Sequence, residues 1–295
     1  MPAAPDWNRD GRDWPNRSAS RFVQAAGLRW HVQIMGSGPD LLLVHGTGAA
    51  THSWRVLASR LARHFRVIAP DLPGHGFTEL PPAHRLSLPG MARALAGLLA
   101  VLDVRPVLAI GHSAGAAILA RMCLDGLIAP ARLISLNGAL LPLGGLAGQI
   151  FSPIAKLLVL NPLVPWALSW RAADRTVVHR LITGTGSTLE PQDLDRYGRL
   201  FARSGHVAGA LGMMANWDLH PLARDLPKLA VPLTLVAAAG DRAIPPGDAH
   251  RVAARVRRGA EVVELPGLGH LAHEEAPERV AEIVMDAFSP AASVA

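Results

Sequence analysis

The sequence predicts an α/β fold built on a mostly parallel sheet, and three observations support this. Short apolar runs typical of strands alternate along the chain with segments of helical pattern. Most of these runs are continuously apolar, which indicates strands buried on both faces. In addition, the motif G-x-S-x-G at residues 111–115 stands between such a run and a helical segment, and that is where α/β enzymes place a nucleophile.

The strands follow from the chain in order. Residues 28–34 alternate apolar and polar side chains, which is typical of a half-buried antiparallel strand, whereas the run at 41–44 is apolar throughout. Helical patterns cover residues 87–102, 114–124 and 245–256. The predicted strands are 22–23, 28–34, 41–44, 66–69, 107–110, 133–136, 233–237 and 262–265.

The interval 140–222 breaks this alternation, because it is far longer than an ordinary connection between two strands. We interpret it as a helical cap inserted into a core of residues 21–139 and 223–290, with residues 1–20 as an N-terminal arm. The first part of the interval is almost entirely apolar, so a membrane span must be considered. Prolines at 142, 153, 162 and 165 divide it into pieces too short to span a bilayer. A cap that makes weak, reversible membrane contact stays open as an alternative.

Composition narrows the classes of function. The chain has 295 residues, 50% of them hydrophobic, which suits one large domain. Its net charge is +6, but the arginines are scattered and form no basic stripe, so we expect no nucleic-acid partner. The single cysteine, Cys123, allows no internal disulfide, and no metal-ligand spacing occurs, so we expect neither a metal nor a cofactor. The polar N-terminus lacks the apolar region of a signal peptide, which favours a cytoplasmic location.

Three residues just past strand ends form a candidate catalytic triad. Ser113 lies at the centre of the G-x-S-x-G motif, Asp241 follows the strand at 233–237, and His270 follows the strand at 262–265. A serine hydroxyl needs a base to take its proton, and that base needs an acid to orient it. The chain order Ser, Asp, His is the order expected for this kind of elbow.

Other residues compete for the roles of acid and base. For Asp241 alone, the role of a turn or N-cap aspartate also stays open. We interpret four competitors as helix-start, connection or loop residues: Asp71, Asp218, Asp248 and His273.

The reaction expected of such a triad is acyl transfer, in which negative charge develops on the former carbonyl oxygen. This oxyanion needs hydrogen-bond donors. One is expected from the backbone N–H of Ala114, directly after the nucleophile, and the other from Thr47 in the glycine-rich loop after the strand at 41–44. The glycine-flanked segments 36–38 and 184–186 lack the context of a phosphate loop. Side chains expected to contact substrate are His45, His112, Trp166, Trp170 and Trp217.

These residues together resemble the α/β-hydrolase superfamily, which implies an eight-stranded sheet, helices on both sides and a variable cap. Epoxide hydrolases and haloalkane dehalogenases of this fold use an aspartate where Ser113 stands, which argues against both chemistries. A closer resemblance is to the magnesium chelatase accessory hydrolases of bacteriochlorophyll biosynthesis. It is carried by residues 10–17, 20–23, 28–33, 45–54, 136–142 and 213–219.

The resemblance implies a role near magnesium insertion into a porphyrin. The first hypothesis is a serine hydrolase acting on an apolar ester or related acyl compound, with a tetrapyrrole ester as one candidate. The second is a porphyrin-binding or delivery protein with little turnover. The third is a partner of the magnesium chelatase subunits.

Overall fold

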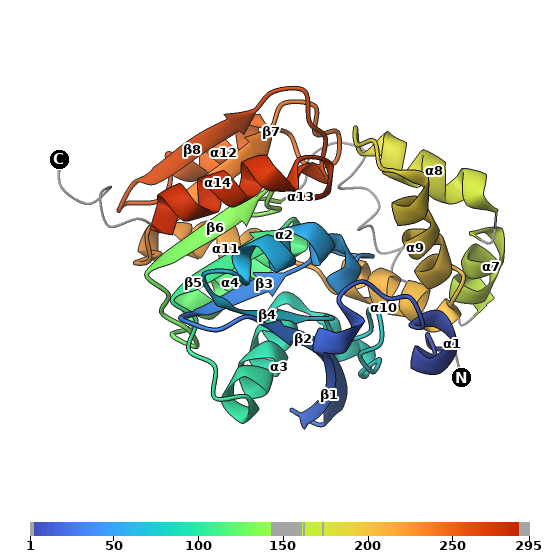
Figure 1. Ribbon diagram of the computed structural model, residues 1–295. Coiled ribbons are helices and arrows are strands. Elements are labelled where there is room, and N and C mark those ends of the chain that lie inside the picture. Colours follow the sequence, from blue (N-terminus) through green and yellow to red (C-terminus); the bar gives the residue numbers. More distant parts are fainter. Residues whose placement is uncertain (1–2, 143–160, 162, 173, 289–295) are drawn as a thin grey trace.

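An eight-stranded sheet forms the centre of the molecule (Figure 1). The computed structural model describes residues 3–142, 161, 163–172 and 174–288. The strand order is β1-β2-β4-β3-β5-β6-β7-β8; β2 pairs antiparallel with β1 and β4, and all other pairs are parallel. The predicted α/β class and mostly parallel sheet are therefore confirmed. The strands are β1 (Ser20–Ala25), β2 (Leu28–Met35), β3 (Asp40–Val44), β4 (Arg66–Pro70), β5 (Leu108–His112), β6 (Arg132–Leu136), β7 (Leu233–Ala238) and β8 (Ala260–Leu265).

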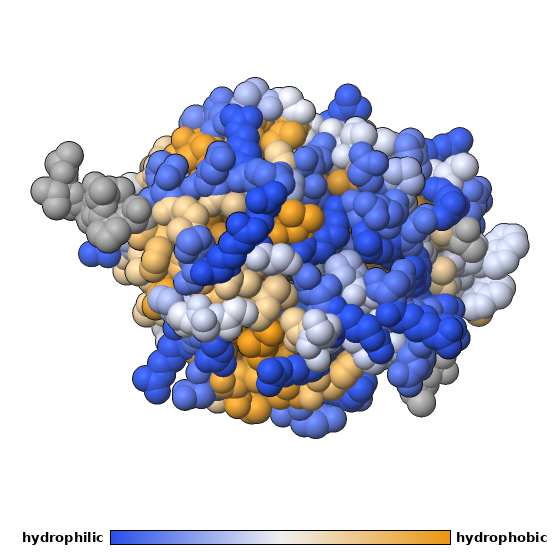
Figure 2. Space-filling model, in the orientation of Figure 1, coloured by the Kyte–Doolittle hydropathy of each residue, from blue (hydrophilic) through white to orange (hydrophobic). Residues whose placement is uncertain are grey.

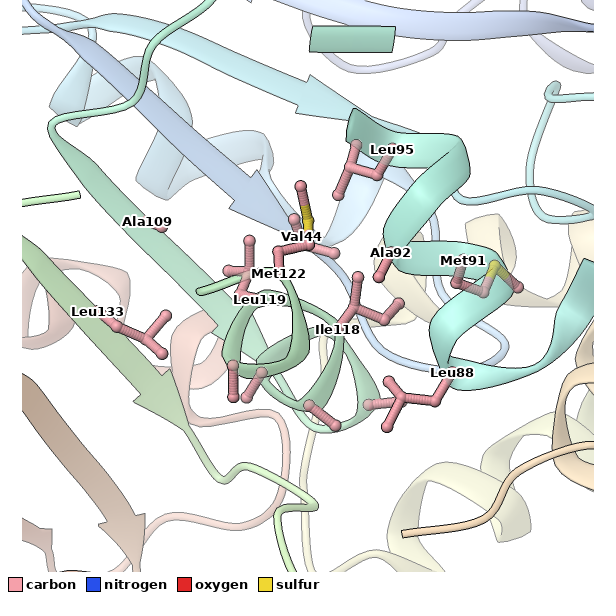
Figure 3. Packing of buried hydrophobic residues seen from close by; sticks show 14 of the residues in the cluster. Val44, Leu88, Met91, Ala92, Leu95, Ala109, Ile118, Leu119, Met122 and Leu133 are labelled. Carbon is pink, nitrogen blue, oxygen red and sulfur yellow. The ribbon is translucent and has the colours of Figure 1, made fainter. Parts of the chain in front are cut away.

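Successive residues of the central strands face opposite sides of the sheet, and each side has its own apolar core. In β3, Leu41 and Leu43 pack with the helices α2 (Arg55–Leu61) and α14 (Pro277–Phe288) on one side. Leu42 and Val44 pack on the other side with α3 (Leu88–Val101), α4 (Ala114–Leu124) and α12 (Gly247–Ala253). Figure 3 shows α3 and α4 bringing Met91, Leu95, Ile118 and Met122 onto that face. Burial on both faces explains why these strands are apolar throughout.

The helices agree with the sequence pattern in place and differ from it in length. The helix α4 spans the predicted residues, and α3 is one residue shorter at each end than predicted. The helix expected at 245–256 is shorter, because it begins only after Pro245 and Pro246. The remaining short elements outside the interval between β6 and β7 are α1 (Trp7–Asp10), η1 (Arg17–Ala19), η2 (Thr51–Trp54), η3 (Ala83–Leu86), η4 (Leu226–Lys228) and α13 (Ala272–Glu275).

Helices also fill the described part of the interval between β6 and β7. They are α7 (Leu163–Arg171), α8 (Arg175–Gly184), α9 (Pro191–Phe201), α10 (Ser204–Ala215) and α11 (His220–Asp225). The first four lie beyond one end of the sheet (Figure 1), and hydrophilic side chains predominate over α8 and α9 on the face shown in Figure 2. Residues 143–160, 162 and 173 lie outside the described residues. They include Pro153 and Pro162, two of the prolines expected to interrupt the apolar stretch. No helix in the described ranges is long and apolar enough to cross a membrane.

Residues near the N-terminus pack against η2 and against the start of α10. Trp14 is buried, and its indole N–H donates to the Thr51 hydroxyl at 2.9 Å. Asp10 accepts two hydrogen bonds from Arg203, which directly precedes α10, at 2.6 and 3.0 Å. The arm thus ties the inserted helices to the core.

Candidate active site

Ser113 occupies the tight turn between β5 and α4 that its motif predicts. Its backbone has φ 52° and ψ −119°, a conformation that non-glycine residues rarely adopt. Such strain persists only where the surroundings impose it, and it is concentrated at functional sites. The turn lifts the serine out of the sheet at the carboxyl end of a central strand.

The glycines of the motif are required by close packing of the strand and the helix. A Cβ atom on Gly111 would lie 2.4 Å from the backbone nitrogen of Ala116, and one on Gly115 would lie 2.1 Å from the carbonyl oxygen of Val44. Both distances are far inside van der Waals contact. Only glycine at positions 111 and 115 therefore lets α4 begin directly after the serine and pack this closely against β5 and β3.

An acid–base pair lies beside this turn. His270 follows β8, and its Nδ1 lies 2.7 Å from Oδ2 of Asp241, which follows β7. The other carboxylate oxygen, Oδ1, accepts the backbone N–H groups of Ala243 and Ile244 at 2.8 and 2.9 Å. Asp241 therefore orients the imidazole and also serves as the turn aspartate that the sequence left open. Burial disfavours the Asp241 carboxylate, but these hydrogen bonds hold its pKa below the usual 3.8.

Asn137 is a member of the site that the sequence analysis did not single out. It follows β6 in a left-handed conformation (φ 48°), and its Nδ2 donates to Oδ2 of Asp241 at 2.7 Å. The available signal was its position: like Ser113, Asp241 and His270, it is a polar residue just past the carboxyl end of a parallel strand.

Thr47 and Ala114 are the two residues expected to supply the oxyanion donors. Thr47 lines the same cavity as Ser113, and Ala114 is the first residue of α4. In the described ranges, neither backbone N–H has a hydrogen-bond acceptor. Both N–H groups are thus unpaired within these ranges.

Buried histidines hold the loop that carries Thr47. His45 bonds the Gly46 carbonyl through Nδ1 (2.8 Å) and accepts the Leu72 N–H at Nε2 (2.9 Å). His206, on α10, bonds the Gly48 carbonyl at 3.1 Å. Burial lowers the pKa of His206 to about 4, so the ring is neutral at ordinary pH. The neutral ring can still donate to the Gly48 carbonyl, which joins α10 to the loop.

A cavity of about 550 Å³ opens onto Ser113 and His270. Its volume suits a small organic ligand. No hydrogen bond joins Ser113 to His270 in the described structure, although both line the cavity; such bonds often tighten only when substrate binds. The walls are largely apolar and come mainly from α8, α9 and α10, with Val177, Leu181, Phe201, Val207, Leu211 and Met214 among them.

The sequence profile of the alpha/beta hydrolase family matches residues 41–283, which is most of the chain. The chain belongs to the alpha/beta hydrolase family. The matched range includes the strained serine turn and the acid–base pair.

Individual relatives agree with this family. A protein named magnesium-chelatase 30 kDa subunit, from Rhodobacter capsulatus, is 37% identical over 276 residues and covers 93% of this chain and 96% of its own length. A soluble epoxide hydrolase from Corynebacterium sp. is 28% identical, over 90% of this chain and 95% of its own. A crystal structure of an alpha/beta hydrolase fold protein from Burkholderia ambifaria has a TM-score of 0.76 and 25% identity, covering 91% of this chain and 97% of that one.

Of the side chains expected to contact substrate, His112 is the one that lines the cavity in the described part of the chain. His45 is fully buried with both ring nitrogens occupied. Trp217 packs against the core, whereas Trp166 and Trp170 are 62% and 73% exposed on α7. The reason is the orientation of α7, which buries Pro165 and Ser169 and brings Leu168 to the cavity, while both tryptophans point outward.

The competing acids and bases have other partners. Asp71 accepts the backbone N–H groups of Thr51 and Phe77 and pairs with His31, so it organises loops. Asp248 lies in the first turn of α12, as expected. His273 is buried against His112 and a tryptophan. Asp218 accepts from the backbone and ring of His220. In the ranges described, no cluster of three or more His, Cys, Asp or Glu side chains is placed to hold a metal ion.

A buried ionic network joins the inserted helices to the core beside the cavity. Glu274, on α13, accepts the Tyr197 hydroxyl at 2.6 Å and pairs with Arg55 at 2.7 Å. Arg55 also pairs with Asp193 of α9. Burial raises the pKa of Glu274 to about 7, although Arg55 and Tyr197 oppose the shift. Sequence patterns do not reveal this network, because its contacts join residues that lie 77, 138 and 219 positions apart along the chain.

Proposed function

We propose that this protein is a serine hydrolase that cleaves an apolar ester or a related acyl compound. One observation carries the proposal: the strained Ser113 turn and the hydrogen-bonded pair of His270 and Asp241 meet at one apolar cavity. A serine at this position favours acyl transfer over epoxide opening, for which relatives of this fold use an aspartate.

In the proposed mechanism, the Ser113 hydroxyl attacks the carbonyl carbon while His270 takes its proton through Nε2. Asp241 holds Nδ1–H of the imidazole and stabilises the imidazolium that forms. The backbone N–H groups of Thr47 and Ala114 bind the oxyanion. His270 then protonates the leaving alcohol, and a water activated by the same imidazole hydrolyses the acyl-serine and restores the enzyme.

We interpret the helices within residues 140–222 as a cap over this site. Support comes from the cavity walls, to which α8, α9 and α10 supply most of the apolar side chains. An apolar cavity that excludes water strengthens the hydrogen bonds to the oxyanion. The cap therefore selects an apolar acyl group and also assists the chemistry.

We further propose that α7 makes reversible contact with a membrane surface. Its residues Leu163, Trp166 and Trp170 are spaced for one helical face and are 67%, 62% and 73% exposed. Tryptophan is enriched at membrane interfaces, so this face of α7 suits such a contact.

A second candidate function is accessory binding rather than turnover. The name of the Rhodobacter capsulatus relative favours it, because that relative is called a subunit of magnesium chelatase. In this alternative the cavity holds a tetrapyrrole for the chelatase. It requires that tetrapyrrole binding and co-purification with chelatase subunits persist in Ser113→Ala.

Labelling with a fluorophosphonate probe tests the hydrolase proposal. We expect the wild type to be labelled and Ser113→Ala to stay unlabelled, because only an activated serine displaces fluoride. Ser59→Ala, altered on α2, serves as the matched control and should be labelled like the wild type. Equal labelling of the wild type and Ser113→Ala, or of neither, would contradict the proposal.

A further inference from the structure

The cavity beside Ser113 contains one permanently charged side chain, that of Arg171, among its described lining residues. Arg171 is the last residue of α7. Apart from the proposed catalytic groups and the His112 ring, the polar side chains of the wall are Thr47, Thr185 and Tyr197. Arg171 is exposed to solvent as well as lining the cavity, so its charge stays hydrated while it faces an otherwise apolar wall.

The hydroxyl groups of the wall already donate to the protein. Tyr197 donates to Glu274 at 2.6 Å, and Thr185 donates to the Ile182 carbonyl at 2.6 Å. Thr47 donates to the sulfur of Met213 at 3.5 Å. These side chains therefore have no free donor with which to hold a polar group of the substrate.

The guanidinium of Arg171 differs from them. Within the described part of the chain it makes no hydrogen bond and no ion pair. The acid nearest to it in sequence, Asp174, interacts with it electrostatically without a hydrogen bond, and one oxygen of that carboxylate accepts the Thr176 N–H at 2.8 Å at the start of α8. Among the described residues, the Arg171 guanidinium with its five N–H donors therefore has no protein acceptor.

We propose that the substrate is an ester with an apolar body and a carboxylate, and that Arg171 binds this carboxylate while Ser113 attacks the ester. This assignment rests on the proposed hydrolase function. Arginine matches a carboxylate through two parallel hydrogen bonds, and an unpaired carboxylate would not enter an apolar cavity. Because Arg171 comes from α7 and Ser113 from the end of the sheet, separate parts of the fold hold the anion and the scissile bond.

The test compares two p-nitrophenyl esters of one long-chain diacid, the first with a free terminal carboxylate and the second with that group converted to a carboxamide. We expect Arg171→Gln to raise KM for the carboxylate substrate about 2- to 5-fold, the upper part of the range for an exposed ion pair. Its kcat, and both constants for the carboxamide, should stay unchanged. Arg180→Gln, altered on α8 outside the cavity lining, is the matched control and should change neither substrate.

Binding to Ser113→Ala separates this inference from the proposed function. Calorimetric titration of the same two compounds needs no turnover, so it should show weaker carboxylate binding when Arg171→Gln is added. If the wild type hydrolyses neither ester but this difference in binding persists, the hydrolase proposal fails and the Arg171 assignment stands. If Arg171→Gln affects both compounds equally, or neither, in hydrolysis and in binding, the assignment is overturned.

Discussion

Replacing Asp241 by asparagine tests the proposed mechanism at a single atom. Oδ1 of Asp241 accepts two backbone N–H groups, so the amide oxygen of asparagine must take that position. The amide nitrogen then replaces Oδ2, which faces two donors: the Nδ1–H of His270 and the Nδ2–H of Asn137. A donor facing donors forces the imidazole to move its proton from Nδ1 to Nε2.

The expected loss follows from that change of tautomer. With its proton on Nε2, His270 cannot accept the proton of Ser113. A triad with the wrong tautomer loses about 10⁴-fold in kcat, or about 5.5 kcal/mol of transition-state stabilisation. Asn137 also loses its acceptor, which costs about 1–3 kcal/mol of folding stability. Because the pKa of Asp241 lies below 3.8, wild-type Asp241 is ionised throughout the usual assay range, and the loss should not depend on pH there.

The assay is steady-state hydrolysis of a p-nitrophenyl acyl ester, with thermal unfolding followed in parallel. Asp248→Asn is the matched control, because Asp248 is also a buried aspartate near the start of a helix but lies outside the site. Its kcat should match that of the wild type. A folded Asp241→Asn variant that keeps kcat within about tenfold of the wild type would refute the assigned role of the carboxylate.

Three further outcomes are expected. Gly115→Ala should destabilise the fold by about 1–3 kcal/mol in denaturant unfolding, because its Cβ would overlap a carbonyl of β3. Gly184→Ala is the control, because a Cβ there meets open space, and it should not destabilise the fold. Equal unfolding midpoints for the two variants would contradict this. Because the folded-state pKa of Glu274 is raised from 4.5 to about 7, the folded state binds more protons than the unfolded state between these values. The wild type should therefore lose stability relative to Glu274→Gln as pH rises through this window, and parallel curves of Tm against pH would exclude the effect. Combined replacement of Trp166 and Trp170 by serine should weaken sedimentation with anionic phospholipid vesicles about tenfold, and an unchanged vesicle-bound fraction would rule out contact through α7.

The fold and the serine turn could be predicted because their signals are local. Each central strand is a continuous apolar run, and burial on both faces requires that pattern. The glycines around Ser113 are set by contacts within one strand–turn–helix unit and its neighbouring strand. The family match and the observed sheet confirm the predicted fold.

The substrate contacts could not be predicted in the same way. In α7, apolar side chains occupy both faces, so sequence periodicity does not tell which face is buried. The structure turns Ser169 inward and Trp166 and Trp170 outward. It also brings Arg171 to the cavity, a residue whose sequence neighbours give no sign of a binding role.

The sequence by itself determined the sheet, the serine turn and the order of the candidate triad, because each depends on residues close together in the chain or on the rule that parallel strands end at one edge. The tertiary structure alone decided that Asn137 holds Asp241, that His206 of the inserted helices holds the Thr47 loop, and that Arg55 joins Glu274 to α9. Each of these contacts spans about 100 residues or more. Hydrogen bonds across such separations form only when packing has already set the distance between the partners, and no local pattern records that distance.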